Sequence, residues 1–167
     1  QLVEKAGKVI AIELDKKMVK ILQERFSLYS NFQLLNEDVL KVDLKTLIEK
    51  ENTQKCPVKI VANLPYYITT PIIMKLLEEK LPIQNITVMV QKEVADRLTA
   101  IPGEKNTGAI TYCVYYYCEP KQIMLVPNTS FIPEPKVNSE VIQLNIRQNL
   151  PVQLKNETVF FKIVKAS

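Results

Sequence analysis

Short apolar runs rich in Val, Ile and Leu recur along the chain, and amphipathic segments separate them. Such runs predict strands at residues 8–15, 32–36, 58–62, 86–90 and 122–126, and we expect those at 58–62 and 86–90 to be buried. Apolar residues at helical spacing predict helices that begin near residues 16, 70, 91 and 160. Strands that alternate with helices are typical of an α/β fold with a mostly parallel sheet.

The last of the apolar runs has a different pattern, because apolar and polar side chains alternate strictly from Val141 to Arg147. Alternation of this kind predicts a strand with one buried face and one wet face. We therefore predict an antiparallel strand at the edge of the sheet.

The composition is that of an ordinary soluble globular protein, with 47% hydrophobic and 24% charged residues in a chain of 167. This length is sufficient for one hydrophobic core and a short appendage. No apolar run approaches the roughly 18 residues that a membrane span requires, and the first five residues do not resemble a signal peptide. The net charge of +4 is compatible with a polyanionic partner but too small to indicate one. We expect a cytoplasmic monomer without membrane contact.

The residue types that the chain lacks restrict its chemistry further. It has no histidine, which excludes a Ser-His-Asp or Cys-His nucleophile, a His-ligated metal and a His general base. Cys56, Cys113 and Cys118 form no C-x-x-C pair, which argues against a zinc ribbon and for reduced thiols in the cytosol. The three glycines form no P-loop or G-x-G-x-x-G motif. We therefore predict no metal site.

The stretch 58–71 carries the strongest candidate chemistry. Its predicted strand ends abruptly in the sequence Asn-Leu-Pro-Tyr at 63–66, and Thr70 and Pro71 then suit the N-cap and the first position of a helix. The loop should therefore lie at the carboxyl end of a buried strand, where open α/β sheets bind ligands. The structural alternative is a proline-containing turn between a strand and a helix.

Such a loop suits the exocyclic amine of adenine, which is a poor nucleophile because its lone pair is delocalised into the ring. The Asn63 side-chain carbonyl and the Leu64 backbone carbonyl can accept hydrogen bonds from both N–H groups and orient the lone pair. Pro65 disfavours helical backbone at Leu64 and so keeps that carbonyl available. Tyr66 can stack on the base. Positioning replaces a strong general base if the leaving group is a neutral thioether expelled from a sulfonium.

The segment from Asn63 to Ile72 resembles the catalytic motif of the ribosomal RNA adenine dimethyltransferases, the KsgA family. Further matches to this family begin at Ile12, Asp38, Gln91 and Ser130. The resemblance covers nearly the whole chain. It implies a Rossmann-like methyltransferase fold, S-adenosylmethionine as cofactor, and dimethylation of adenine N6 in small-subunit ribosomal RNA during ribosome biogenesis, with the 30S subunit as partner. It also implies a helix over residues 107–117, although the tyrosines and valine there favour a strand.

The same resemblance implies which residues bind the cofactor. Glu13 matches the glutamate that binds the ribose. Asp38, followed by Val39, matches the aspartate that accepts a hydrogen bond from the cofactor's adenine amine. Val39 and Asn63 are the other two residues expected to bind the cofactor. The alternative for Glu13 is a solvated acid that caps the next helix, a role that suits Asp15 better. For Asp38 the alternative is an Asx turn or a helix N-cap.

Phe131 matches the phenylalanine that lies against the target base opposite Tyr66, in a loop stiffened by two prolines. Each such stack is worth about 1–3 kcal/mol, and the alternative for Phe131 is a plain core anchor. Lys92, Arg97 and Lys136 could contact RNA phosphates at the active-site face. The alternative for the helical pair is a solvated helix face.

The family would place a first strand and a Gly-rich turn before Gln1, and a small helical RNA-contacting domain after Ser167. We therefore predict a partial methyltransferase domain over 1–150 that lacks the first strand and Gly-rich loop. Residues 151–167 are expected to be a linker and the start of the helical domain. We expect residues 1–167 alone to bind S-adenosylmethionine weakly or not at all and to be inactive. One departure is Asn138, where the family usually has aspartate.

Other interpretations stay open on the sequence. The related Erm methyltransferases modify large-subunit RNA, but their loop resembles Asn-Ile-Pro-Tyr, so Leu64 and the continuation over 67–72 favour the small-subunit enzymes. DNA adenine methyltransferases carry proline in place of Leu64. The third alternative interpretation is a noncatalytic protein built on the same fold, either an RNA-binding assembly factor or a transcription factor. Intact Asn63, Tyr66 and Phe131 argue against a dead site.

Overall fold

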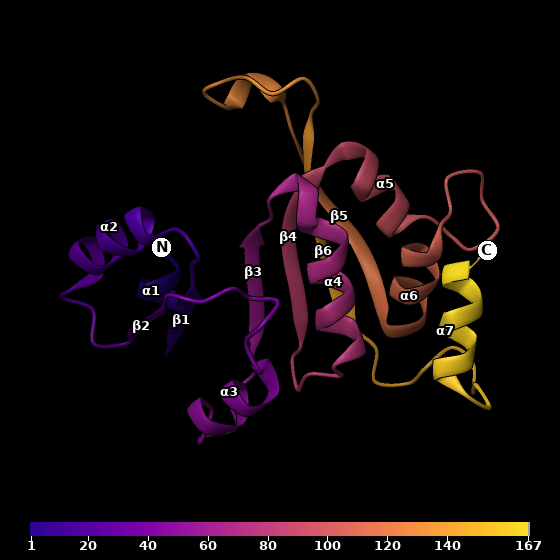
Figure 1. Cartoon of the computed structure of the whole chain (residues 1–167), viewed down its shortest axis with the longest axis horizontal. Coiled ribbons are helices and arrows are strands. Elements are labelled where there is room, and N and C mark those ends of the chain that lie inside the picture. The colour runs from indigo at the N-terminus through magenta and orange to yellow at the C-terminus, as the bar shows by residue number, and fades with distance from the viewer. Residues whose placement is uncertain (167) are drawn as a thin grey trace. The chain divides into compact units, whose positions relative to one another are not determined.

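The computed structural model describes residues 1–166, and the chain divides into two units, Gln1–Leu47 and Ile48–Ser167. Figure 1 labels the helices and strands of both units. Helices alternate with strands in each of them, which confirms the predicted α/β class. One helix, α3 (Leu44–Glu51), runs across the division.

The first unit contains a parallel pair of strands with a helix between them. Strands β1 (Val9–Ile12) and β2 (Phe32–Leu35) pair in register over their whole length. Helix α2 (Lys16–Phe26) connects them. Asp15 is its N-cap and accepts a hydrogen bond from the Lys17 N–H at 2.7 Å, as the sequence predicts for that residue.

Two side-chain contacts hold the elements of this unit together. The short helix α1 (Leu2–Lys5) is attached through Asn31, whose Nδ2 donates to the Val3 carbonyl at 2.8 Å. At the other side, the rings of Phe26 and Phe32 lie 4.7 Å apart between their centroids. This contact packs the last turn of α2 against the start of β2.

The second unit is built on a mixed sheet, whose strands in the described residues have the order β3-β4-β6-β5. The strands are β3 (Lys59–Asn63), β4 (Asn85–Gln91), β5 (Cys118–Val126) and β6 (Ser139–Ile146). β3 pairs with β4 in parallel, whereas β4 and β5 both pair with β6 antiparallel. A register shift between Gln122 and Met124 bends β5 near its middle.

The predicted antiparallel strand at 141–147 is present as β6, but its predicted place at the edge of the sheet is wrong. β6 lies inside the sheet, between β4 and β5, and β5 forms that edge. The alternating pattern reports only that one face is buried. It says nothing about whether a neighbour pairs with each side of the strand, so the pattern alone could not place β6.

Three helices pack against this sheet and one another, namely α4 (Thr69–Glu78), α5 (Lys92–Thr99) and α6 (Ala109–Tyr117). The fully buried side chains between the helices and the sheet include Ile73, Ile86, Leu98, Ile142 and Leu144. α6 is a helix in spite of its strand-forming residues, as the resemblance predicts. Burial of one of its faces outweighs the intrinsic preference of its tyrosines.

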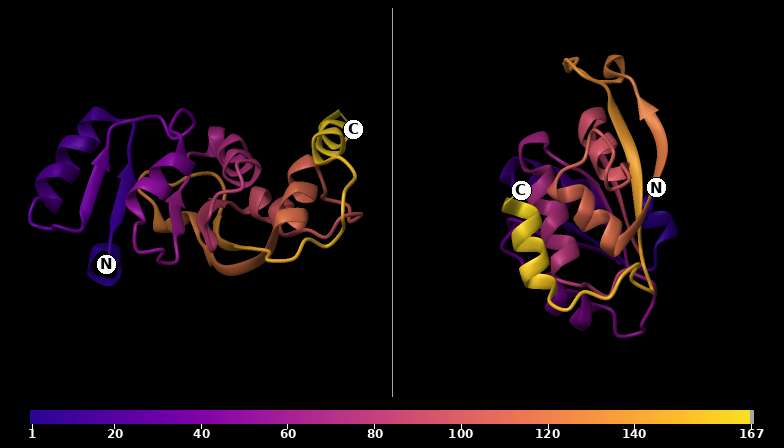
Figure 2. Two further views of the ribbon diagram at one scale, coloured as in Figure 1. Left: turned by 90° about the horizontal axis from the view of Figure 1, so that it is seen from below. Right: turned by 90° about the vertical axis from the view of Figure 1, so that its right-hand side faces the viewer.

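A final helix, α7 (Glu157–Ala166), packs beside α6 (Figure 2). Phe161 is 7% exposed and stacks on Tyr117, with their ring centroids 5.6 Å apart. The Glu157 carboxylate accepts hydrogen bonds from the hydroxyls of Tyr116 and Tyr117. The proposed division of the chain at residue 150 stays a prediction.

Candidate active site

The Asn-Leu-Pro-Tyr loop begins at the carboxyl end of a parallel strand. Asn63 is the last residue of β3 and lies opposite Met89 of β4. The pairing extends one residue further, because the Leu64 N–H donates to the Met89 carbonyl at 3.3 Å. The Leu64 side chain is 6% exposed, whereas Asn63 is exposed. The buried leucine therefore anchors the loop and leaves the asparagine at the surface.

A turn of 3-10 helix, η1 (Tyr66–Ile68), connects this loop to α4. The Pro65 carbonyl accepts a hydrogen bond from the Thr69 hydroxyl at 3.0 Å. Helix α4 begins at Thr69, so the prediction that Thr70 caps it and that Pro71 occupies its first position is wrong. The 3-10 turn extends the helical path to earlier residues, and Pro71 still falls in the first turn, where no intrahelical N–H is needed.

Tyr66 is held by a residue far away in the sequence. Its hydroxyl lies 2.9 Å from the Ser139 Oγ, and Ser139 is the first residue of β6 and fully buried. The tyrosine itself is 38% exposed. One end of its ring is thus fixed inside the protein while a large part of its surface faces solvent. The neighbouring Tyr67 is 84% exposed.

Phe131 lies in the connection between β5 and β6, which protrudes beyond the sheet (Figure 1). The connection contains the 3-10 turn η2 (Asn128–Ser130), and the Asn128 Nδ2 donates to the Glu134 carboxylate at 2.7 Å. Phe131 is half-buried. Among the described residues, no ring contact joins Phe131 to Tyr66. A base stacked between these two rings is still a prediction.

Lys92, at the start of α5, is bound to carboxylates of its own unit. Its ammonium pairs with Asp96 on the same helix and lies 3.3 Å from Oε2 of the buried Glu140 in β6. The hydrogen bond with Asp96 and the contact with Glu140 raise the pKa of Lys92. Lys92 therefore compensates a buried negative charge, whatever else it contacts.

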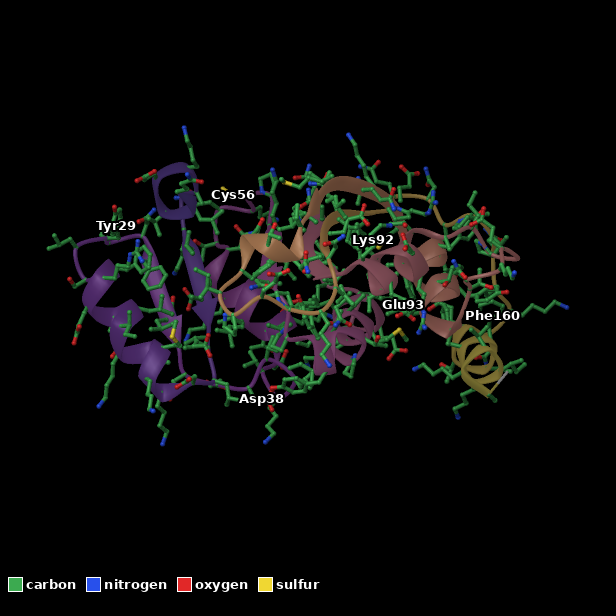
Figure 3. All side chains as sticks on the ribbon, turned by 90° about the horizontal axis from the view of Figure 1, so that it is seen from above. Tyr29, Asp38, Cys56, Lys92, Glu93 and Phe160 are labelled. Carbon is green, nitrogen blue, oxygen red and sulfur yellow. The ribbon has the colours of Figure 1, made fainter. Side chains whose placement is uncertain are left out.

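The other predicted RNA-binding residues are more accessible. Arg97 is half-exposed and pairs with Glu93 one turn earlier on α5, at 2.5 Å (Figure 3 labels Glu93). Lys136 is exposed in the connection that carries Phe131. Exposed ion pairs of the Arg97 type are weak, so its guanidinium can exchange the carboxylate for a phosphate at little cost.

In the first unit, the predicted cofactor-binding acids Glu13 and Asp38 follow the carboxyl ends of the two paired parallel strands. Glu13 follows β1, and its Oε1 accepts a hydrogen bond from the Asp15 N–H at 2.8 Å. Asp38 (labelled in Figure 3) follows β2, and its Oδ1 accepts from the Leu40 N–H at 3.0 Å, forming an Asx turn around Val39. Two carboxylates so placed suit ligands that offer hydroxyl and amine donors, as a ribose and an adenine do.

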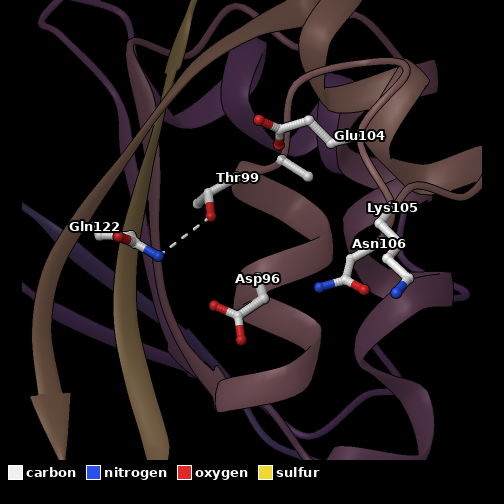
Figure 4. Close-up of a pocket in the computed structure, with 7 residues that line it drawn as sticks. Asp96, Thr99, Glu104, Lys105, Asn106 and Gln122 are labelled. Atoms are coloured by element: carbon white, nitrogen blue, oxygen red, sulfur yellow. Dashed lines mark hydrogen bonds between the residues drawn. The ribbon is translucent and has the colours of Figure 1, made fainter.

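A surface hollow lies elsewhere in the second unit, beside the second half of α5 (Figure 4). The residues that line it are Asp96, Thr99, Ala100, Glu104, Lys105, Asn106 and Gln122. A smaller hollow next to it includes Arg97. Residues 63–66 line neither of them, so these hollows are separate from the Asn-Leu-Pro-Tyr loop.

Two further observations concern residues 1–166. No three acidic or thiol side chains among them come together in a way that could hold a metal ion. No helix in this range has the length and apolarity needed to cross a membrane.

A family model described as ribosomal RNA adenine dimethylase matches residues 1–167, the whole of the chain. The chain belongs to the ribosomal RNA adenine dimethylase family.

Curated members of this family are identical to the chain at about half of the aligned positions. Ribosomal RNA small subunit methyltransferase A of Lachnoclostridium phytofermentans is 51% identical over 167 residues, which cover 99% of this chain and 57% of that protein. The protein of the same name from Geobacillus thermodenitrificans is 50% identical over 100% of this chain and 57% of its own length. The chain thus spans little more than half the length of these relatives.

Solved structures of similar fold also fall among RNA methyltransferases. A dimethyladenosine transferase from Plasmodium falciparum is 29% identical, with a TM-score of 0.73 over 88% of this chain and 50% of that one. The 23S rRNA methyltransferase ErmE has the same TM-score over 99% of this chain and 61% of its own, at 24% identity. The dimethylase fold of the chain is therefore the Rossmann-like methyltransferase fold.

Sequence reasoning missed several residues that shape the dimethylase loops. Asn36 binds the loop after β1, because its Nδ2 donates to the Glu13 carbonyl at 2.9 Å. Ser139 holds Tyr66, and Asn138 accepts a hydrogen bond from the Asn128 N–H at 3.0 Å. The available signal was position only: Asn36 precedes a predicted ligand, and the other two follow a family motif.

Proposed function

We propose that this protein transfers methyl groups from S-adenosylmethionine to N6 of adenines in small-subunit ribosomal RNA, and so acts in ribosome biogenesis in the cytoplasm. Family membership and the names of the most similar curated relatives support this proposal. The observation that carries it is the loop at the end of β3, where Asn63 is exposed while its neighbour Leu64 is buried.

In this proposal the loop activates the amine by geometry. The Asn63 side-chain oxygen and the Leu64 carbonyl accept hydrogen bonds from the two N–H groups of adenine N6, which reduces the delocalisation of the lone pair and orients it toward the methyl donor. Pro65 holds the backbone extended, and Tyr66 and Phe131 stack on the two faces of the base. A proton leaves N6 for solvent after transfer. No strong general base is needed, because positioning supplies the acceleration.

The cofactor would be held in part by the first unit. Glu13 is proposed to accept from the ribose hydroxyls, and Asp38 with Val39 to bind the adenine end. Their position at the carboxyl ends of two parallel strands supports this role. When bound, S-adenosylmethionine would supply a methyl group activated by a sulfonium, with a neutral thioether as the leaving group.

The proposed partner is the small ribosomal subunit, bound by the protein as a monomer. Arg97 and Lys136 are proposed to contact RNA phosphates, because both are exposed cations in the second unit. Lys92 is also proposed as an RNA contact, because its side chain is 41% exposed.

The test supplies the full-length protein with labelled S-adenosylmethionine and, separately, undermethylated small subunits, large-subunit RNA and duplex DNA. Label should enter only the small subunits. The Asn63→Ala variant should lose most turnover, at least about 100-fold, but keep RNA binding. Asn149→Ala, which alters another exposed asparagine of the same unit, is the matched control and should stay active.

Other outcomes of this test would favour other functions. Label in large-subunit RNA would indicate an Erm-type enzyme, for which the likeness to ErmE supplies the fold alone. RNA binding without any label would indicate a noncatalytic assembly factor. Equal loss of turnover and RNA binding in Asn63→Ala would contradict the assigned role of the asparagine.

A further inference from the structure

A serine hydroxyl with no access to solvent lies directly behind the proposed base-stacking tyrosine. Ser139 is fully buried, and its Oγ lies 2.9 Å from the Tyr66 hydroxyl. Polar groups in such a position cost free energy unless they are hydrogen-bonded, so this contact is obligatory for the serine. It joins the 3-10 turn η1 to the start of β6, at residues that are separated by 73 positions in the sequence.

The backbone around Ser139 is fixed from both sides. The serine begins β6, one of the two inner strands among the described residues of this sheet, and lies opposite Gln91 at the end of β4 and Val126 at the end of β5. A residue paired with a neighbour on each side cannot move without disturbing both strands. The serine hydroxyl is therefore a rigid reference point for the Tyr66 ring.

The preceding residue, Asn138, connects the same point to the loop of Phe131. Its backbone carbonyl accepts a hydrogen bond from the Lys92 N–H at 3.0 Å, which attaches it to the start of α5. Its side-chain oxygen accepts from the Asn128 N–H, also at 3.0 Å. Asn128 in turn donates to the Pro135 carbonyl at 3.2 Å, on the far side of the loop. The bonds on Asn138 thus tie the two ends of the Phe131 loop to each other and to the start of α5.

We propose that the pair Asn138-Ser139 is a positioning element that sets where the Tyr66 and Phe131 rings lie relative to one another. Ser139 orients Tyr66 through its hydroxyl, and Asn138 holds the loop of Phe131. This inference rests on the proposed function, in which the two rings receive the target adenine. Neither residue contacts the base in this account, and both act through other side chains.

The consequence of losing the serine hydroxyl follows from the exposure of its partner. Tyr66 is 38% exposed, so its hydroxyl can bind water once Ser139 is gone, and the ring is then free to rotate away. RNA would still bind through its phosphates, but fewer bound bases would be stacked correctly. We expect kcat to fall about fivefold, the effect of one neutral hydrogen bond, with little change in the KM for small subunits.

The experiment compares Ser139→Ala, Tyr66→Phe and the double variant in the full-length protein, with undermethylated small subunits and S-adenosylmethionine. Tyr66→Phe keeps the ring and removes only the hydroxyl from a partly exposed position, so it should fold even if Ser139→Ala does not. Each single variant should lower kcat by a similar factor. The double variant should be no slower than either, because all three lack the same hydrogen bond.

Thr111→Val is the matched control, since it removes another fully buried hydroxyl, one bonded to the Arg97 carbonyl at 2.7 Å. It should lower the melting temperature without changing kcat. Wild-type kcat in Tyr66→Phe, or additive losses in the double variant, would overturn the inference while the activity itself stands. An inactive wild-type protein would instead refute the proposed function.

Discussion

The attachment of α7 to the second unit leads to a prediction about Phe161. This side chain is 7% exposed, and its ring centroid lies 5.6 Å from those of both Tyr116 and Tyr117. Phe161→Ala removes this packing and leaves a cavity beneath α7. Truncation of a buried phenylalanine costs about 3–5 kcal/mol.

We expect the lower end of that range, about 3 kcal/mol, because α7 packs on the unit through one face and can partly settle into the cavity. For a unit of this size that loss corresponds to a fall in melting temperature of roughly 10 °C. The measurement is thermal unfolding followed by circular dichroism, together with hydrogen exchange of the α7 amides. Val159→Ala on the same helix is the control, since Val159 is 50% exposed and should change stability by less than about 0.5 kcal/mol.

The result that would refute this reasoning is an unchanged melting temperature in Phe161→Ala with lost protection confined to the α7 amides. In that case α7 would be a separately folding element, as the predicted division at residue 150 requires. A cooperative fall in the melting temperature would place α7 in the same folding unit as the sheet.

Two further predictions concern charged groups of the second unit. Hydrogen bonds from Lys80 and the two tyrosine hydroxyls lower the pKa of Glu157, so its contribution to stability is complete above its unfolded pKa and is lost as the pH falls through the folded one. The difference in unfolding free energy between the wild type and Glu157→Gln should therefore shrink between neutral pH and about pH 3, and a difference independent of pH would contradict the assignment. Lys92→Gln should cost about 2 kcal/mol in urea unfolding because it leaves Glu140 buried without its cation, and Glu140→Gln in the same chain should restore most of the loss. Reduced RNA binding without a loss of stability would show instead that Lys92 acts only as an RNA contact.

Much of the secondary structure followed from local pattern. The helix at 16–26 and its cap at Asp15 were predictable because both depend on residues within a few positions of one another. The strand that ends at Asn63 and the buried face of the following helix, which includes Ile73 and Leu77, were predictable for the same reason. The start of that helix was misplaced by two residues, since the 3-10 turn before it leaves no signature in the composition.

The sequence by itself therefore determined the order of the elements, the buried face of α4 and the chemistry that the Asn-Leu-Pro-Tyr loop offers. The expected burial of the strand before that loop is wrong, because β3 alternates exposed and half-buried residues. Only the tertiary structure decided that β6 lies inside the sheet, that Ser139 meets Tyr66 and that Lys92 is bound to Glu140. The reason is physical. The period of apolar residues is set by the geometry of one element, whereas a partner from a distant segment is chosen by how the whole core packs, and that information is spread over the chain.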